Sequence, residues 1–206
     1  MHIPSCQTDQ LRLVPFDAAL EAALAPSPDY DVSRWLYVPN VYAEYRYILG
    51  TRGERPLICV GVNPSTAAPD HLDNTLKSVE RVARFNGYDS FLMFNVYAQR
   101  ATDPDDMEPF CNPELHAENM RAFDYALSLD RAGAPAVWAA WGAVIEKRDY
   151  LPQCVRDMIA VGQRRGTRWF TAGSRSKKKG HPHHPLYLRK DSPLEEFNVE
   201  EYLDQL

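Results

Sequence analysis

The sequence predicts an α/β fold, a three-layer α/β/α sandwich around a four-stranded, mostly parallel central sheet, with an added strand from an N-terminal hairpin. Two observations carry this prediction. Apolar runs at residues 57–62, 91–97, 136–141 and 167–172 are nearly continuous, which is typical of strands covered on both faces. Segments with helical spacing separate these runs, and such alternation of strand and helix indicates a parallel sheet with helices on both sides.

The N-terminal part of the chain adds the hairpin. Residues 1–35 are expected to be mostly irregular, with one short helix over residues 17–24 that is ended by prolines. Residues 42–49 are rich in β-forming side chains, and a turn at residues 50–53 leads into the first apolar run. We therefore expect residues 42–49 to pair with the strand at 57–62.

Three helices are expected between the four strands. The first covers about residues 73–86, where the apolar side chains approximate helical spacing and Asn86-Gly87 provides a stop. The second runs from about Glu114 to Leu129. The third occupies residues 143–162, and Pro152 predicts a kink or break within it because proline lacks the N–H that the helix needs.

Length and composition are typical of one globular domain. The 206 residues are 45% apolar and 25% charged, and no apolar run approaches the ~20 residues that span a bilayer. We predict one domain over 1–206, with an irregular segment at 1–35, an α/β core over about 36–190 and a tail at 191–206. The N-terminus lacks a signal-peptide pattern, so we expect a cytoplasmic protein with no membrane partner. The composition predicts no oligomeric state.

Cysteine and charge patterns narrow the class of function. The four cysteines are scattered without a C-x-x-C pair, which disfavours a metal site built from nearby thiols; free thiols are expected. The net charge of -5 does not suggest a general nucleic-acid binder. Basic residues nevertheless gather between residues 164 and 179, where they form either a local basic face or a solvated loop. They are Arg164, Arg165, Arg168, Arg175, Lys177, Lys178 and Lys179.

Candidate site residues follow the ends of the predicted strands, because ligands of open α/β sheets bind outside the carboxyl ends of the strands. The first strand runs into the polar loop Asn63, Pro64, Ser65 and Thr66, which is either a ligand loop or an ordinary turn with a helix cap. Asn95 to Thr102 and Trp141-Gly142 follow the next two strands. Within these segments, Tyr97, Arg100 and Trp141 are candidate substrate contacts.

The segment after the fourth strand is rich in histidine. His181, His183 and His184 lie within four residues, but two prolines stiffen the segment and no Cys or carboxylate lies nearby in sequence to complete a metal shell. We therefore predict no metal site and no cofactor. A proline-fixed imidazole at a strand end can instead donate a hydrogen bond to a developing anion, and surface histidines on a loop are the alternative.

These segments, taken together, resemble a known family. Asn63-Pro64-Ser65 with Asp73-Asn74-Thr75, then Asn95-Val96-Tyr97-Ala98 with Arg100-Ala101-Thr102-Asp103-Pro104, then Ala140-Trp141-Gly142, then His184-Pro185-Leu186-Tyr187, is similar to the family called domain of unknown function 1643. The resemblance covers about residues 35–190. Several motifs occur in the family's order, which makes it specific, but the family's name implies no chemistry.

A more distant resemblance implies an activity. The layout is similar to the uracil-DNA glycosylase superfamily, which has a parallel α/β/α sheet. That resemblance implies that Asn63 orients the hydrolytic water, that Asn95 reads the edge of a base, and that His184 stabilises the departing base anion. Ser65 stands where that superfamily usually has glycine, and Leu186 where it usually has serine. Both differences count against a standard DNA glycosylase.

Three functions are therefore carried forward. The first is a glycosylase-like hydrolase that acts on a nucleobase in nucleic acid or a nucleotide, with Asn63, His184 and Asp73 as catalytic residues; Asp73 could equally be a helix cap. The second is a non-catalytic nucleotide- or nucleic-acid-binding protein on the same fold. The third and weakest is a metal-dependent hydrolase. If nucleic acid binds, its contacts are expected from Arg175, Lys177, Lys178, Lys179, Leu186 and Tyr187, the last two as wedges.

Overall fold

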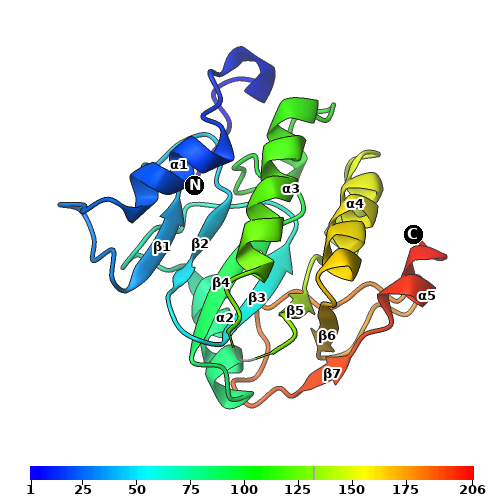
Figure 1. The fold of residues 1–206 in the computed structure, drawn as a ribbon. Helices are drawn as coiled ribbons and strands as arrows, with labels where there is room; N and C mark the ends of the chain where they lie inside the picture. Colours follow the sequence, from blue (N-terminus) through cyan, green and yellow to red (C-terminus); the bar gives the residue numbers. More distant parts are fainter. Residues whose placement is uncertain (132) are drawn as a thin grey trace.

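The computed structural model describes residues 1–131 and 133–206 and confirms the α/β class. Its centre is a seven-stranded sheet in the order β1-β2-β4-β3-β5-β6-β7. The strands are β1 (Trp35–Val38), β2 (Ile48–Thr51), β3 (Pro56–Gly61), β4 (Ser90–Asn95), β5 (Ala136–Ala139), β6 (Arg168–Ala172) and β7 (Leu194–Glu196). The helices are α1 (Phe16–Leu24), α2 (Asn74–Phe85), α3 (Pro113–Leu127), α4 (Leu151–Arg164) and α5 (Val199–Leu203). Figure 1 shows α3 and α4 in front of the sheet and α2 behind it.

The four strands expected from the apolar runs form the middle of the sheet. β3 pairs in parallel with β4 on one side and with β5 on the other, and β5 pairs in parallel with β6. Three further strands, all antiparallel to their neighbours, extend the sheet at its two edges. The expectation of a four-stranded sheet is thus too small, because the short edge strands lack a continuous apolar run.

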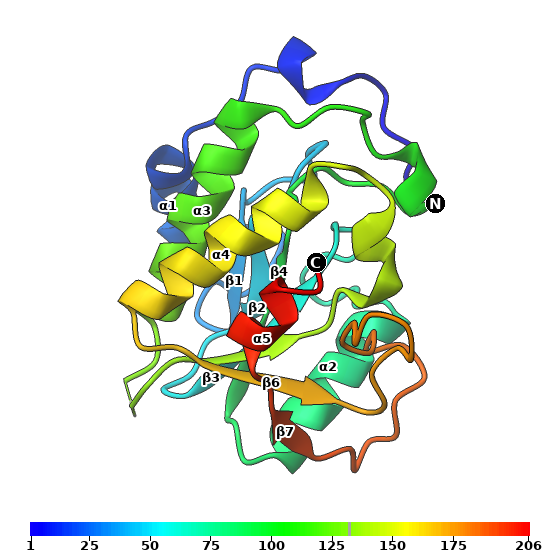
Figure 2. The ribbon, with the colours of Figure 1, turned by 90° about the vertical axis from the view of Figure 1, so that its right-hand side faces the viewer.

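The central strands are apolar throughout because they separate two hydrophobic cores. Along β3, Ile58 and Val60 face the core shared with α1, α3 and α4, whereas Leu57 and Cys59 face the core shared with α2. Successive side chains of a strand point to opposite faces, so both sets are buried. Figure 2, turned by 90°, shows the sheet with α2 on one side and α3 and α4 on the other.

The predicted hairpin is wrong. β2 begins at Ile48 and pairs with β1 and β4, not with β3. Gly50, expected in a turn, lies inside β2 opposite Leu92, where an added Cβ would sit 2.1 Å from the Phe91 carbonyl oxygen. This glycine permits close approach of two strands and does not turn the chain.

The predicted helices are confirmed with small shifts at their ends. The Asp73 carboxylate caps α2 by accepting the Leu76 N–H at 2.9 Å, and Gly87 follows the helix with a φ of 80°. The break expected near Pro152 divides residues 143–162 into a 3-10 helix, Gly142–Glu146, and α4. Pro152 lies in the first turn of α4, where its missing N–H has no partner to lose.

The C-terminal segment 191–206 is part of the folded body. It contributes β7 to the sheet and α5 to one face, and Phe197, Val199 and Tyr202 are buried in the core. Within the described residues, none of the helices has the length and apolar character needed to cross a membrane.

Candidate active site

The strand order places a ligand-binding position at the carboxyl end of β3. The chain leaves β3 through α2 to reach β4 on one side, whereas β4 is followed by α3 and leads to β5 on the other side. The connections therefore pass to opposite faces of the sheet next to β3, as Figure 2 shows. In open α/β sheets, this arrangement opens a crevice in which ligands bind.

A pocket of about 480 Å³ occupies this position. Asn63, Asn95 and His184, which lie far apart in the sequence, all line it, and so do Asp73 and Trp141. Its volume lies within the range of pockets that hold small molecules. Three separate segments of the chain therefore meet in one pocket at the end of the sheet.

The loop after β3 holds Asn63 in a defined orientation. Its Nδ2 donates to the Ala101 carbonyl oxygen at 2.7 Å, so the amide is tied to the loop that follows β4. Pro64 is buried, and its carbonyl oxygen accepts the Ala101 N–H at 2.9 Å. Among the described residues, no donor contacts the Asn63 Oδ1, which leaves this oxygen to accept a hydrogen bond from a ligand or a water.

Asn95 ends β4 beneath the same pocket and is almost completely buried. Its hydrogen bonding is satisfied when Nδ2 faces the backbone carbonyl oxygens of Asn63 and Phe94, each at 3.2 Å. The Oδ1 is then the atom that remains for a ligand donor. Gly61, also in the pocket lining, keeps space for this amide, because a Cβ at Gly61 would lie 3.3 Å from it.

Asp73 can serve two roles, as a helix cap and as a group in the pocket. One oxygen, Oδ1, is used as the N-cap of α2, as the structural alternative predicted. The residue also lines the pocket, and its second oxygen has no hydrogen-bond donor among residues 1–131 and 133–206. A carboxylate that is both fixed by a helix end and open to a pocket is suited to orient a water.

His184 presents one ring nitrogen to the pocket in a defined protonation state. Its Nδ1 accepts the Leu186 N–H at 3.3 Å, so the neutral ring carries its proton on Nε2. Burial, reinforced by the neighbouring His183, lowers the pKa of His184 below its usual range, against a smaller opposite effect of Asp73. At neutral pH the side chain is therefore a neutral imidazole that can donate from Nε2.

The residues after His184 form part of the pocket rim. Leu186 and Tyr187 both line the pocket, and the Tyr187 side chain is 91% exposed. The φ of Tyr187 is 70°, a left-handed conformation that non-glycine residues adopt rarely. An exposed aromatic ring held in this way can stack on a planar ligand.

Several predicted substrate contacts lie elsewhere. Tyr97 is fully buried, donates to Glu108 and accepts the Asn112 N–H at 2.8 Å, so it belongs to the core. Thr66 is exposed and does not line the pocket, whereas Ser65 does. Arg100 is buried behind the loop after β3 and donates to its Ser65 carbonyl oxygen. It supports the loop and does not line the pocket.

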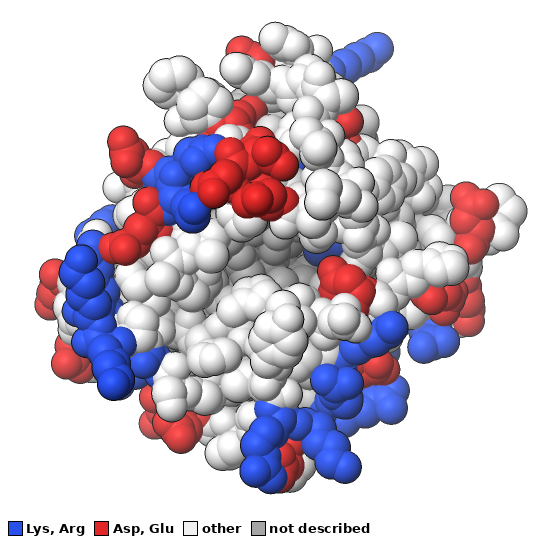
Figure 3. Space-filling model, turned by 180° about the vertical axis from the view of Figure 1, so that it is seen from behind, with Lys and Arg blue, Asp and Glu red and all other residues white. Residues whose placement is uncertain are grey.

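The predicted basic contacts also lie outside the pocket. Lys177 and Lys178 are exposed, Lys179 pairs with Glu146, and the Arg175 guanidinium lies 5.7 Å from the centre of the Phe197 ring. On the face drawn in Figure 3, Lys and Arg form separate groups interspersed with Asp and Glu, around a hollow whose walls are mostly uncharged. That face has no continuous basic stripe of the kind that follows a nucleic-acid backbone.

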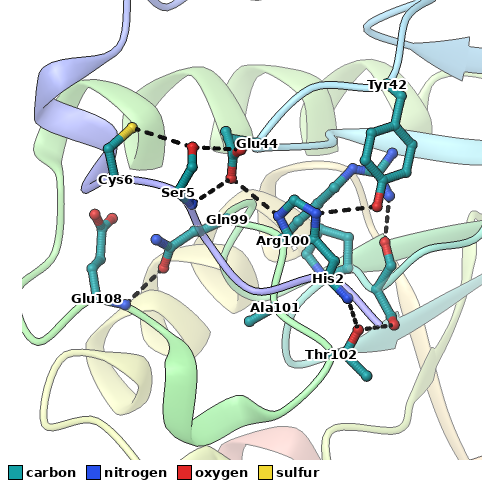
Figure 4. Close-up of polar contacts among 12 residues, drawn as sticks. His2, Ser5, Cys6, Tyr42, Glu44, Gln99, Arg100, Ala101, Thr102 and Glu108 are labelled. Atoms are coloured by element: carbon teal, nitrogen blue, oxygen red, sulfur yellow. Dashed lines mark hydrogen bonds and ion pairs between the residues drawn. The ribbon is translucent and has the colours of Figure 1, made fainter.

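Sequence reasoning missed two features of the site. Arg46 lines the pocket although it is only 1% exposed. The N-terminal segment, expected to be irregular, docks at the rim: the His2 N–H donates to the Thr102 Oγ1 at 2.6 Å, and the His2 ring lies 3.1 Å from Glu44. Figure 4 shows this segment beside Glu44, Arg100 and Thr102. Tyrosines flank Arg46 in an apolar segment, the one signal that could have indicated its burial.

The three histidines do not form a metal centre. In the part of the chain that the structure describes, no three His, Cys, Asp or Glu side chains come together in a way that could hold a metal ion. His181 is buried and bonds through Nδ1 to the Tyr202 hydroxyl at 2.8 Å, whereas His184 faces the pocket. The histidines therefore serve different parts of the structure.

Comparison with protein families identifies the chain. Residues 46–186 match the family model described as protein of unknown function (DUF1643). The chain belongs to the DUF1643 family. The matched range contains the segments that carried the resemblance, except for the last residue, Tyr187. No curated protein and no solved structure matches this DUF1643 chain, so the likeness to the uracil-DNA glycosylase superfamily has no support from these comparisons.

Proposed function

We propose that this DUF1643 protein is a glycosylase-like hydrolase that cleaves the bond between a nucleobase and its sugar, in nucleic acid or in a nucleotide. The observation that carries the proposal is the convergence of Asn63, Asn95 and His184 on one pocket at the carboxyl end of β3. Hydrolysis of this bond needs a positioned water, a donor for the leaving base and shielding from solvent. The pocket offers groups for the first two of these needs.

The water would be held between Asn63 and Asp73. The open Oδ1 of Asn63 accepts one hydrogen bond from the water, and its Nδ2 bond to Ala101 keeps that oxygen in place. The second oxygen of Asp73 takes the proton that the water loses as it attacks the sugar carbon. A weak acceptor such as an amide suits a reaction in which the bond to the base breaks early and little proton abstraction is required.

The leaving base would be stabilised by His184 and recognised by Asn95. As the bond breaks, both of its electrons stay with the base, and the Nε2–H of neutral His184 donates to the developing negative charge. The open Oδ1 of Asn95 accepts an N–H from the edge of the base. The exposed ring of Tyr187 is suited to stacking on the planar base at the rim.

Separate substitution of Asn63 and His184 tests the proposal. The probes are nucleoside 5′-monophosphates and oligonucleotides that contain uracil or hypoxanthine, with the free base measured by chromatography. We expect Asn63→Ala and His184→Gln each to lower kcat by about 10²–10³-fold, the effect of removing one such group, with little change in affinity. His71→Gln, at an exposed histidine outside the pocket, is the matched control.

The alternative outcome identifies a binding protein. If the wild-type chain binds a probe but releases no base, the hydrolase proposal is refuted and the protein is a non-catalytic binder. Equal kcat for wild type and His184→Gln would also contradict the role of the imidazole.

A further inference from the structure

Two buried arginines lie together beside the pocket without a carboxylate partner. Arg46 is 1% exposed and Arg100 is fully buried, and both donate to the carbonyl oxygen of Ala67, at 3.0 and 3.4 Å. Within residues 1–131 and 133–206, neither guanidinium lies within 4 Å of an Asp or Glu oxygen. The Nε atoms of both are buried and have no hydrogen-bond partner. Such a pair is costly, because two buried positive charges repel each other and, among the described residues, neither forms an ion pair with a carboxylate.

The two arginines differ in what they face. Arg100 is used internally: it donates to the Ser65 carbonyl oxygen and to the Tyr37 hydroxyl, at 3.0 Å for the latter, and stacks on Tyr42 at 4.3 Å. Within the part of the chain that the structure describes, the Arg46 side chain makes one hydrogen bond, to the Ala67 carbonyl oxygen, and it lines the pocket. Burial and then repulsion by Arg100 lower the pKa of Arg46 to about 9, against a weaker influence of Asp73. The Arg46 guanidinium thus has N–H groups beyond the one bonded to Ala67, and its side chain is part of the pocket lining.

We propose that Arg46 is the anion subsite of this pocket and binds the phosphate of a free nucleoside monophosphate. This proposal rests on the proposed function, which assigns the nucleobase of the ligand to Asn95 and His184. A phosphate monoester carries about two negative charges at neutral pH and forms charge-assisted hydrogen bonds with a guanidinium, so it suits a buried arginine in the lining of a pocket.

The burial of Arg46 favours a free nucleotide over a polymer. The phosphates of a nucleic acid are contacted by exposed Lys and Arg side chains. The exposed lysines of the described residues all lie outside the pocket; they are Lys77, Lys147, Lys177, Lys178 and Lys190. The docked N-terminal segment holds Thr102 at the pocket rim through His2. A short ligand can place its phosphate on a buried arginine, whereas a continuous strand would have to enter and leave the same pocket.

Calorimetric titration of the full chain tests this subsite without any reference to catalysis. The probes are nucleoside 5′-monophosphates, the corresponding nucleosides, inorganic phosphate and a single-stranded oligonucleotide. A hydrogen-bonded charge pair predicts that the best monophosphate binds about tenfold or more tightly than its nucleoside. Arg46→Met should abolish this difference and leave nucleoside affinity unchanged, and Arg46→Lys should retain part of it. Arg84→Met, at an exposed arginine of α2, should behave as wild type.

The outcomes separate this subsite from the proposed reaction. Equal affinity for monophosphate and nucleoside in the wild type, no binding of any phosphate-bearing probe, or tighter binding of the oligonucleotide than of every monophosphate would each overturn it. These comparisons need no variant, so they hold even if Arg46→Met does not fold. A monophosphate that binds through Arg46 but loses no base refutes only the hydrolase; base release that is independent of Arg46 refutes only the subsite.

Discussion

Removal of one hydroxyl group, in Tyr202→Phe, is expected to destabilise the protein substantially. The Trp141 Nε1–H donates to the Tyr202 oxygen at 2.9 Å, and the Tyr202 hydroxyl in turn bonds to the His181 Nδ1 at 2.8 Å. Burial raises the pKa of Tyr202 to about 12, so the hydroxyl keeps its proton and donates it to His181. Phenylalanine keeps the ring but leaves two groups, the indole N–H and the imidazole nitrogen, buried and unpaired.

The size of the effect follows from those two groups. Each buried polar group without a partner costs about 1–3 kcal/mol, and loss of the buried hydroxyl itself offsets part of that sum. We expect the free energy of unfolding to fall by about 2–4 kcal/mol, which for a chain of this length lowers Tm by about 5–15 °C. Urea unfolding and a thermal melt of both proteins measure it. Tyr187→Phe, at a 91% exposed tyrosine, is the control and should differ from wild type by less than about 0.5 kcal/mol.

The Tyr202→Phe substitution should also weaken ligand binding in the pocket. The His181 N–H donates to the Ser176 Oγ at 3.0 Å, and the His181 carbonyl oxygen accepts the Ser176 N–H at 2.9 Å, so His181 anchors the segment that leads to His184. Without Tyr202's hydroxyl this segment loses a buried attachment, and ligand affinity should fall together with stability. If the unfolding free energy of Tyr202→Phe lies within about 0.5 kcal/mol of that of wild type, with the same dependence on urea, the hydrogen bonds of Tyr202 to Trp141 and His181 do not stabilise the fold as argued.

Three further outcomes are expected. Asp73→Asn keeps an oxygen for the Leu76 N–H and should leave stability nearly unchanged, whereas Asp73→Ala should lose about 1 kcal/mol in urea unfolding; equal losses would contradict the cap. Gly61→Ala places a Cβ 2.7 Å from the Met93 Cε, which can rotate away, and 3.3 Å from the Asn95 amide. The free energy of unfolding should therefore fall by only about 1 kcal/mol, whereas ligand binding measured by calorimetry should weaken. Unchanged affinity would count against Asn95 as a ligand contact. Because burial lowers the pKa of His184, the unfolded chain takes up a proton at this residue more readily than the folded chain does. The contribution of His184 to the free energy of unfolding should therefore be fully present above about pH 6.5 and decline below it, so that stability falls less steeply in His184→Gln. Identical profiles of stability against pH for the two proteins from pH 7.5 to 5 would refute this.

The central sheet could be predicted because its signals are local and consistent. Strands β3 and β4 are covered on both faces, so each shows as a continuous apolar run whatever the rest of the chain does. Asp73 marks a helix start through a hydrogen bond to the Leu76 N–H, and Pro152 marks a helix break because it lacks an N–H, so both signals involve only nearby residues. Such features depend on nearby residues alone, so they can be predicted from the sequence.

The sheet edges could not be predicted, because strand pairing is a long-range choice. Residues 48–51 could pair with the following strand through a turn, and only the folded sheet shows that β2 instead pairs with β1 and β4. Gly50 illustrates the ambiguity. A glycine permits both a turn and a close approach of two backbones, and the 2.1 Å separation that an added Cβ would have from the Phe91 oxygen distinguishes the two only once the structure is present.

The candidate site likewise contains residues that the sequence indicates and one residue, Arg46, that it does not indicate. Asn63 and Asn95 stand out as polar residues directly after apolar runs, whereas His184 was singled out among three histidines by the resemblance to the uracil-DNA glycosylase superfamily. Arg46 was missed because a charged side chain is expected at the surface, and its burial arises from three separate segments that meet around it. A sequence that specified only a stable fold would place an apolar residue there. Since Arg46 is instead buried beside a second arginine and faces the pocket, the simplest physical compensation for its charge is an anion that enters with the ligand.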